Sequence, residues 1–233
     1  MDVDRNAQKN KDFFDRKKDG YDIVHEKYMP TKELLAKNLP VEATKIVDLG
    51  VGTGLELISI LNKVPNAYIR GIDISQGMLD KLREKNIPGN VELICGDFFK
   101  EDFGTDNDAV VSTSALHHFA KEDKLRLYRK IFDSLKVGGV FINSDKIVFN
   151  DDEEQEQLRL YEEFIDSEEY PHIDTPLTVE HEKDTLEASG FTDISVSITD
   201  KDDYRLFKAY KRKWLIWITR YIYLKIEKII LKN

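Results

Sequence analysis

The chain has 233 residues, a net charge of −9 and 41% hydrophobic residues, which allows one large domain with a sizeable core. The acidic charge argues against a nucleic-acid partner, and the single cysteine, Cys95, excludes an internal disulfide and a cysteine-based zinc site. The first residues lack the apolar core of a signal peptide, and no apolar run reaches the ~18 residues of a membrane span, so we expect a cytoplasmic protein.

Two helices separated by a turn are predicted for residues 10–39. Pro30 and Thr31 begin the second helix and Pro40 ends it, because proline is tolerated in the first turn of a helix and disrupts its interior. We assign residues 1–43 to an N-terminal helical cap. The apolar positions of this segment are Phe13, Phe14, Ile23, Val24, Tyr28, Leu34 and Leu35.

A glycine-rich turn follows a predicted buried strand at Ile46–Leu49. Its alternating glycines are Gly50, Gly52 and Gly54. Glycine is needed where the backbone takes a positive φ or comes close to a ligand. Such a turn exposes backbone N–H groups at a helix N-terminus, beside the carboxyl end of a strand. The predicted helix after the turn carries Leu57, Ile58 and Leu61 on one face.

The spacing of this turn, Asp48-x-Gly50-x-Gly52-x-Gly54, differs from the dinucleotide fingerprint, which has two residues between its second and third glycines. It resembles the first motif of the class I S-adenosylmethionine-dependent methyltransferases. Their cofactor, S-adenosyl-L-methionine, is a nucleoside with an amino-acid tail, and the resemblance implies that Asp48 suits the tail's ammonium group.

The same resemblance concerns two tyrosines of the helical cap. In this family N-terminal helices lie over the cofactor. Tyr21 and Tyr28 would then either face the ligand or only pack the cap on the sheet.

A second strand is predicted at residues 67–75, and Asp73 stands near its end. An acidic residue about 20 positions beyond a glycine loop binds ribose hydroxyls in related folds, because a carboxylate accepts two hydrogen bonds from a diol. The resemblance implies this role for Asp73, with Ile74 beside it. Ser75 is a predicted N-cap of the next helix. Met78 in that helix either packs on the adenine or belongs to the core.

A third strand is predicted at residues 90–99, with Asp97 and Phe98 at its carboxyl end. The resemblance implies that the Asp97 carboxylate accepts a hydrogen bond from the adenine amino group, and that the Phe98 backbone N–H donates to a ring nitrogen. The alternative is that Asp97 is only a solvated turn residue.

A fourth strand at Asp108–Val111 is followed by a loop at residues 112–118. Its first residues, Ser112, Thr113 and Ser114, are small, so the backbone can approach the methionine moiety of the cofactor. We include Ser112 among the predicted cofactor contacts.

Two adjacent histidines, His117 and His118, end this loop where the resemblance places the transferred methyl group. An imidazole there can take a proton from an attacking O–H or N–H group, since its ordinary pKa is near 6.5. The alternative is that the pair only lines the pocket. Adjacent histidines are a poor metal site and no third ligand is evident in the sequence, so we expect no metal.

The remaining segments complete the pattern of an α/β fold. A helix is predicted over residues 121–136, ended by Gly138 and Gly139, and a strand over 140–146. The segment LKVGGVFINSD resembles the family's last shared segment, with Val137 where proline is usual. An acidic helix at 150–169 either attracts a cationic substrate or is a solvated face.

Two further strands follow, DISVSI and residues 204–211, and the resemblance implies that the last one is antiparallel. We therefore expect a Rossmann-like, seven-stranded, mostly parallel sheet with an antiparallel seventh strand and helices on both faces. Residues 44–211 would form the S-adenosylmethionine-binding domain.

A basic, apolar tail is predicted at residues 212–233. On a helix, one face of this tail is apolar and must be shielded from water: Leu215, Ile218, Ile222, Ile226 and Ile229. The cover is the protein's own core, a second subunit in a homodimer, or a membrane surface, where basic residues beside tryptophan and tyrosine suit anionic lipid.

The resemblance implies a methyltransferase that moves a methyl group from S-adenosyl-L-methionine to a small-molecule acceptor by in-line displacement, leaving S-adenosyl-L-homocysteine. Two alternatives stay open within the cofactor's chemistry: an enzyme similar to the carboxy-S-adenosylmethionine synthases of tRNA modification, or a non-catalytic binding subunit. The synthases need an arginine near the methyl position, and the sequence does not place one. A dehydrogenase-like nucleotide-binding domain is a further alternative, against which the glycine spacing argues.

Overall fold

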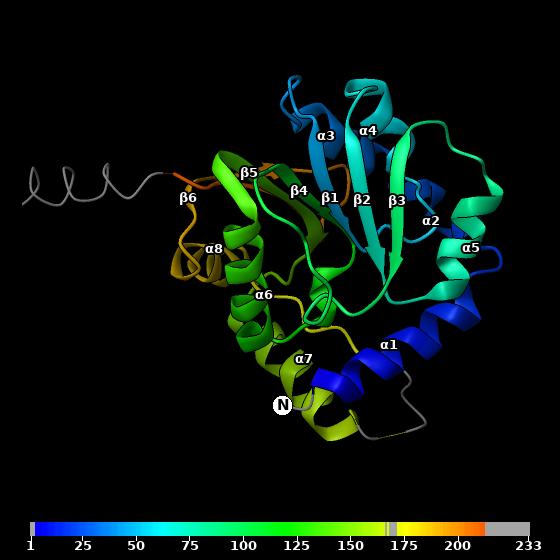
Figure 1. The fold of residues 1–233 in the computed structure, drawn as a ribbon. Helices are drawn as coiled ribbons and strands as arrows, with labels where there is room; N and C mark the ends of the chain where they lie inside the picture. Colours follow the sequence, from blue (N-terminus) through cyan, green and yellow to red (C-terminus); the bar gives the residue numbers. More distant parts are fainter. Residues whose placement is uncertain (1–2, 166, 168–171, 213–233) are drawn as a thin grey trace, which may run out of the picture.

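A computed structural model describes residues 3–165, 167 and 172–212 of the chain. One seven-stranded sheet has the order β3-β2-β1-β4-β5-β7-β6 (Figure 1). The strands are β1 Lys45–Leu49, β2 Tyr68–Asp73, β3 Asn90–Cys95, β4 Asn107–Thr113, β5 Leu135–Lys146, β6 Thr192–Ile198 and β7 Tyr204–Tyr210. The α-helices are α1 Val3–Lys17, α2 Tyr21–His25, α3 Met29–Asn38, α4 Leu57–Lys63, α5 Gln76–Glu84, α6 Lys121–Ser134, α7 Asp151–Phe164 and α8 Val179–Ala188. Two short 3₁₀ helices are η1 Glu26–Tyr28 and η2 Leu116–His118.

The strand directions confirm the predicted fold class. Neighbouring strands from β3 to β5 pair in parallel, whereas β7 pairs antiparallel with both β5 and β6. The chain order reverses between β1 and β4, where connections leave the sheet toward opposite faces. In open α/β sheets this switch point, at the carboxyl ends of the strands, is where ligands bind.

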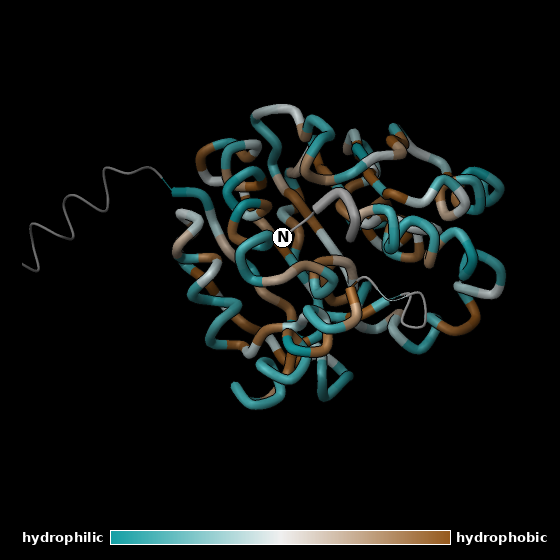
Figure 2. The backbone as a smooth tube through the Cα atoms, turned by 90° about the horizontal axis from the view of Figure 1, so that it is seen from below, coloured by the Kyte–Doolittle hydropathy of each residue, from teal (hydrophilic) through white to brown (hydrophobic). Residues whose placement is uncertain are grey.

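Apolar residues pack against both faces of the sheet, because successive side chains of a buried strand point to opposite sides. In β1, Ile46 joins the cluster that packs under α3, α4 and α5, while Val47 and Leu49 join the cluster under α6 and α8. Figure 2 shows hydrophobic segments running through the interior with hydrophilic helices around them. The predicted helices on both faces are thus present.

The end of α6 differs from the prediction. The helix ends at Ser134 and the strand β5 begins at the next residue, so the glycine pair lies inside the strand and does not cap the helix. Gly138 has φ +87°, and a Cβ on Gly139 would lie 2.9 Å from the Asn107 carbonyl oxygen. The two glycines lie where the register between β4 and β5 shifts, between Asn107 and Ala109 of β4. On the other side of β5, the Lys211 N–H donates to the Gly139 carbonyl and extends the pairing of β5 with β7.

The N-terminal helices lie against the carboxyl ends of the strands. Figure 1 shows α1 running past the ends of β2 and β3. Asp15 of α1 accepts hydrogen bonds from Ser75 Oγ at 2.6 Å and Gly77 N at 3.0 Å, which ties α1 to the start of α5. Asp22 of α2 accepts from the Thr53 hydroxyl in the glycine turn. The division into a cap at 1–43 and a domain at 44–211 stays a prediction.

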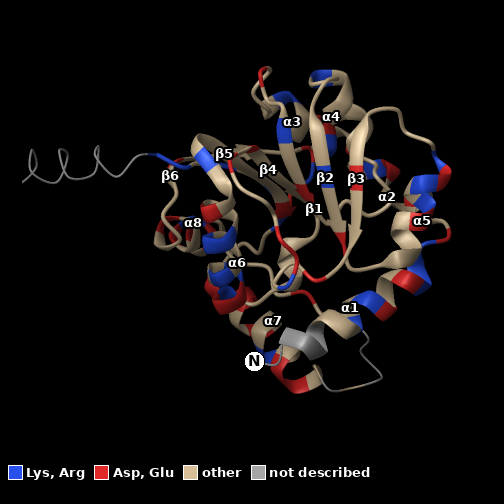
Figure 3. Ribbon diagram, viewed as in Figure 1, with Lys and Arg blue, Asp and Glu red and all other residues tan. Residues whose placement is uncertain are grey.

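Two features of the described part bear on surface contacts. Figure 3 shows acidic residues along α7, and residues of both signs of charge along α1 and α5. None of the helices in the described residues is long and apolar enough to cross a membrane. The predicted tail at 212–233 lies outside the described residues except for Arg212, which pairs with Asp193.

Candidate functional site

A pocket of about 790 Å³ that is open to solvent lies at the carboxyl ends of the parallel strands. It is formed by the loops after β1, β2, β3 and β4 together with α1, α2 and α3. Most of the predicted cofactor contacts line it: Gly50, Gly52, Asp73, Ile74, Met78, Asp97 and Phe98. His118, one of the two predicted catalytic histidines, also lines it. The predicted residues outside this lining are Asp48, Gly54, Ser112, His117 and Tyr28.

The three glycines of the turn have positive φ angles but different neighbours. A Cβ on Gly50 would lie 2.5 Å from Ala115 Cβ, so only glycine lets the β4 loop close onto the turn. Gly52 has φ +51°, and its N–H donates to Asp73 Oδ2 at 2.8 Å. Gly54 lies behind the pocket, where a Cβ would be 2.4 Å from Leu82 Cδ1. Gly54 therefore serves the packing of the turn against α5.

Asp73 is nearly buried, 8% exposed, at the end of β2. Its two oxygens accept backbone hydrogen bonds, Oδ2 from Gly52 and Oδ1 from Ser75, each at 2.8 Å. Burial raises the pKa of Asp73 to about 6, although these two hydrogen bonds favour the ionised form. Ser75 is the N-cap of α5, as predicted, and accepts from Met78 N at 3.1 Å.

Asp97 and Phe98 follow β3 and form another part of the wall. Asp97 Oδ1 accepts from Phe99 N at 2.9 Å, which stabilises the turn. The other oxygen, Oδ2, is buried, accepts no hydrogen bond from the described residues and lies 3.9 Å from Lys100 Nζ. An acceptor atom is therefore available at the place predicted for the adenine amino group.

A buried ion pair that the sequence analysis missed lies at another side of the pocket. Lys32 Nζ of α3 is 2.9 Å from Glu56 Oε2, and both residues line the pocket. Asp48 lies fully buried behind them, where burial and the nearby Glu56 carboxylate raise its pKa well above the usual value. The available signal was the position of Lys32 at helical spacing from the buried Leu35 and Ala36.

The structure places some of the other predicted cofactor contacts in the pocket and others outside it. Tyr21 lines the pocket, whereas Tyr28 packs on Tyr204 with ring centroids 5.3 Å apart. Ser112 lies behind the wall, where its hydroxyl donates to the Leu49 carbonyl at 2.8 Å and ties β4 to β1. Its neighbours Thr113 and Ser114 line the pocket in its place.

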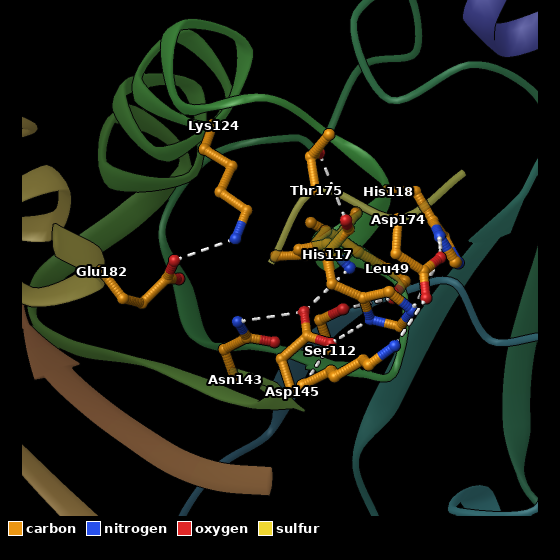
Figure 4. Close-up of polar contacts among 12 residues, drawn as sticks. Leu49, Ser112, His117, His118, Lys124, Asn143, Asp145, Asp174, Thr175 and Glu182 are labelled. Atoms are coloured by element: carbon orange, nitrogen blue, oxygen red, sulfur yellow. Dashed lines mark hydrogen bonds and ion pairs between the residues drawn. The ribbon is translucent and has the colours of Figure 1, made fainter. Parts of the chain in front are cut away.

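The two histidines belong to a buried polar cluster that also contains acidic residues from distant segments (Figure 4). His117 Nδ1 bonds to Asp145 of β5, and its Nε2 lies 3.7 Å from Asp174 Oδ1. His118 Nδ1 is 3.1 Å from the same Asp174 oxygen, and His172 Nε2 is 2.9 Å from it. The structure thus places a third side chain that could hold a metal ion, Asp174, beside the histidine pair, where the sequence shows none.

The charges of this cluster follow from its burial and its neighbours. Burial and the adjacent His117 lower the pKa of His118 to about 3, so its imidazole is neutral. Burial also disfavours the charged form of His117, but Asp145 and Asp174 outweigh it and raise its pKa. His117 and His118 hold the pKa of Asp174 far below its usual range despite its burial. The cluster therefore combines an ionised carboxylate with a neutral imidazole that faces the pocket.

The acidic helix α7 contributes no described residue to the pocket. Its first residues are exposed, which favours the solvated-face alternative. The exception is Glu154, which is buried and accepts from Thr178 N at 2.7 Å and contacts His181 Nδ1 at 2.8 Å.

Comparisons with known proteins bear on the family and the fold of the chain. A family model described as a methyltransferase domain matches residues 46–139. The chain is 30% identical over 140 residues to the carboxy-S-adenosyl-L-methionine synthase of Campylobacter fetus, which covers 59% of each chain. It is 27% identical over 192 residues to the synthase of that name from Nautilia profundicola, covering 76% of this chain and 81% of the relative.

Solved structures show the same fold. A candidate O-methyltransferase from Nostoc punctiforme aligns with a TM-score of 0.62 and 27% identity over 78% of this chain and 56% of its own. Human N-acetylserotonin methyltransferase, in complex with S-adenosylmethionine, aligns with a TM-score of 0.66 and 19% identity over 86% of this chain and 56% of its own. The chain thus spans little more than half the length of these proteins and of the Campylobacter relative. The resemblance drawn from the sequence is confirmed.

Proposed function

We propose that this chain, whose domain and fold are those of the class I S-adenosylmethionine-dependent methyltransferases, transfers a methyl group from S-adenosyl-L-methionine to a small-molecule acceptor. The observation that carries the proposal is one pocket that gathers the glycine turn, Asp73 and the Asp97–Phe98 pair. These groups follow three neighbouring strands, so the fold places them at one edge.

The pocket wall supports a definite orientation of the cofactor. Asp97 and Phe98 suit the adenine edge, and Asp73 retains acceptor capacity for the ribose diol beyond its backbone bonds. Lys32 and Glu56 offer opposite charges to the carboxylate and ammonium groups of the amino-acid tail. This places the tail beside the buried Asp48 and directs the sulfonium toward His118.

The acceptor end of the pocket is lined by Asn10, Phe14, His118 and Phe119. An apolar wall with a few polar groups suits a small organic acceptor. The acceptor's lone pair attacks the methyl carbon, the carbon–sulfur bond breaks, and its electrons remain on sulfur in S-adenosyl-L-homocysteine. Alignment of the three atoms with water excluded supplies most of the acceleration. The single cysteine fits the reducing cytoplasm, where we propose that the enzyme acts.

S-adenosyl-L-homocysteine is expected to stabilise the protein. At a hundredfold excess over its dissociation constant, a ligand that binds only the folded state adds about 2.7 kcal/mol to the free energy of unfolding. Differential scanning fluorimetry should show the rise in Tm with this ligand and none with NAD at equal concentration. A shift with NAD alone would assign the pocket to a dehydrogenase-like domain.

Asp73→Ala should weaken cofactor binding by roughly 1.5–3 kcal/mol, because hydrogen bonds to a charged acceptor are lost. Isothermal titration with S-adenosyl-L-homocysteine measures the change. Asp80→Ala is the matched control, since Asp80 lies on the next helix and is exposed. Equal affinities of the Asp73 variant and the wild type would remove Asp73 from the ribose site.

The pH dependence of wild-type binding gives a related expectation. The pKa of Asp73 in the free protein is raised to about 6, so the ionised acceptor is present above that pH and is lost as the pH falls through it. Below pH 6 the apparent dissociation constant should therefore rise toward about tenfold per pH unit. Asp73→Asn should flatten this dependence, and an unchanged slope in that variant would assign the titration to another group.

A second candidate function comes from the names of the curated relatives, carboxy-S-adenosyl-L-methionine synthases. Such a product carries an extra carboxylate, for which we expected an arginine near the methyl position. Among the described residues that line the pocket, the single lysine or arginine is Lys32, and the proposed orientation already assigns it to the carboxylate of the amino-acid tail. This observation favours methyl transfer. Mass spectrometry of the nucleoside extracted from the purified protein separates the two, because the carboxylated cofactor has a different mass.

A further inference from the structure

We propose that His117, His118 and Asp174 bind a divalent transition-metal ion, with zinc as the test ion, at the acceptor end of the pocket. Binding of the ion rests on the geometry of these side chains alone. Its catalytic role rests in addition on the proposed methyl transfer.

The ligand atoms are spaced as a metal ion requires. Asp174 Oδ1 lies 3.1 Å from His118 Nδ1 and 3.7 Å from His117 Nε2, and one ligand atom from each of the three residues lies within 4.8 Å of the others. Ligands bound to zinc at about 2.0–2.2 Å in tetrahedral positions lie roughly 3.4 Å apart. The two separations from Asp174 Oδ1 lie on either side of that value, and the third, between the histidine nitrogens, is at most 4.8 Å, so binding of the ion would require side-chain rotations.

His117 is also held at its other ring nitrogen, as metal-binding histidines usually are. His117 Nδ1 bonds to Asp145, which directs Nε2 toward Asp174. Asp145 is itself fixed by the backbone N–H groups of Leu116 at 3.0 Å and Lys146 at 2.9 Å. A carboxylate bonded to the far nitrogen of a ligating histidine fixes the tautomer of the ring and raises its basicity.

Asp174 is oriented in a comparable way. Lys146 Nζ is 3.1 Å from Asp174 Oδ2, which leaves Oδ1 directed at the histidines. His172 Nε2 contacts Oδ1 at 2.9 Å, and its Nδ1 is 3.1 Å from Asn10 Oδ1. We assign His172 and Lys146 as positioning residues for the carboxylate. Three protein ligands leave a fourth position of the ion for the acceptor, as in catalytic zinc sites.

The fourth position faces the pocket, because His118 lines it whereas His117 does not. A hydroxyl or thiol of the acceptor bound there has a lowered pKa and releases its proton to solvent. The resulting oxyanion or thiolate attacks the methyl carbon as the carbon–sulfur bond breaks. The acceptor is therefore a small molecule with a hydroxyl or thiol group that can coordinate the ion.

The test uses the full-length chain with Cys95→Ser as the background, since Cys95 is an exposed thiol that can bind zinc by itself. Zinc binding is measured by isothermal titration and by metal content after dialysis. Asp174→Ala and His118→Ala should weaken zinc binding by more than the ~10–100-fold expected for Asp145→Asn, which changes only an orienting group. His181→Ala is the matched control, because His181 also pairs with a buried carboxylate but lies outside the cluster.

Two results would show that the metal site does not exist. Zinc affinity in the Asp174 and His118 variants equal to that of the background overturns the inference, as does the absence of zinc binding in the background protein. The shift in Tm with S-adenosyl-L-homocysteine is recorded for every variant as the folding control. A shift without zinc binding refutes the metal site and leaves the methyltransferase proposal standing. Zinc binding that depends on Asp174, without that shift, refutes the proposed function and retains the site.

Discussion

Glu182→Ala is expected to lower the free energy of unfolding by about 3–5 kcal/mol, because it leaves a buried lysine charge without its partner. Lys124 Nζ lies 2.9 Å from Glu182 Oε2, and the two side chains are 1% and 3% exposed. The Tyr128 hydroxyl donates to the other carboxylate oxygen. This network joins α6 to α8 on the face of the sheet away from α3. None of its three residues lines the pocket, so the substitution should lower stability without changing the pocket.

Urea denaturation followed by circular dichroism measures this loss. A double variant, Lys124→Met with Glu182→Leu, should lie much closer to the wild type, since replacing a buried pair by apolar groups of similar volume is often neutral. Glu163→Ala removes an exposed pair with Arg159 and should cost no more than about 1 kcal/mol. If Glu182→Ala is as stable as Glu163→Ala, the buried lysine finds another partner and the account of the network is wrong.

The sequence predicted the parts of the fold that depend on neighbours along the chain. The glycine turn and the Ser75 N-cap are patterns within a few residues, and each implies its own backbone conformation. Asp73 follows from its spacing of about 20 residues from the glycine turn. The carboxyl ends of parallel strands then meet at one edge, whatever the loops contain. For this reason, most of the predicted cofactor contacts line one pocket.

The groups that the sequence did not reveal are pairs from distant segments. Asp174 lies in the connection before α8, without a periodic pattern, and meets His118 only because that connection folds under the β4 loop. Lys32 of α3 and Glu56, the N-cap residue of α4, likewise come from separate segments. The early start of β5 has a similar cause: pairing of Leu135 with Asn107 of β4 overrides the local preference of glycine for a helix end.

His118→Ala should reduce kcat far more than it reduces affinity for S-adenosyl-L-homocysteine. His118 is 6% exposed, lines the acceptor end of the pocket and is fixed by Asp174 at 3.1 Å, whereas the predicted adenine and ribose contacts lie in other loops. A side chain that takes part in removing the acceptor's proton contributes about 10²–10⁴-fold to the rate. That range applies if the imidazole accepts the proton itself. If the imidazole instead holds a metal ion, the rate falls because the acceptor's hydroxyl or thiol is no longer acidified. A residue that only shapes the wall contributes much less.

The comparison requires turnover with an acceptor found by screening small hydroxyl and thiol compounds, and titration of the cofactor product on the same samples. His181→Ala serves again as the control, because its ring is half-buried against Glu154 but does not reach the pocket. A loss in kcat of at least about 10² with unchanged product affinity would place His118 at the reacting atoms. The reverse pattern is normal turnover with weakened product binding. It would show that His118 contacts the cofactor, and the acceptor would then lose its proton at another residue.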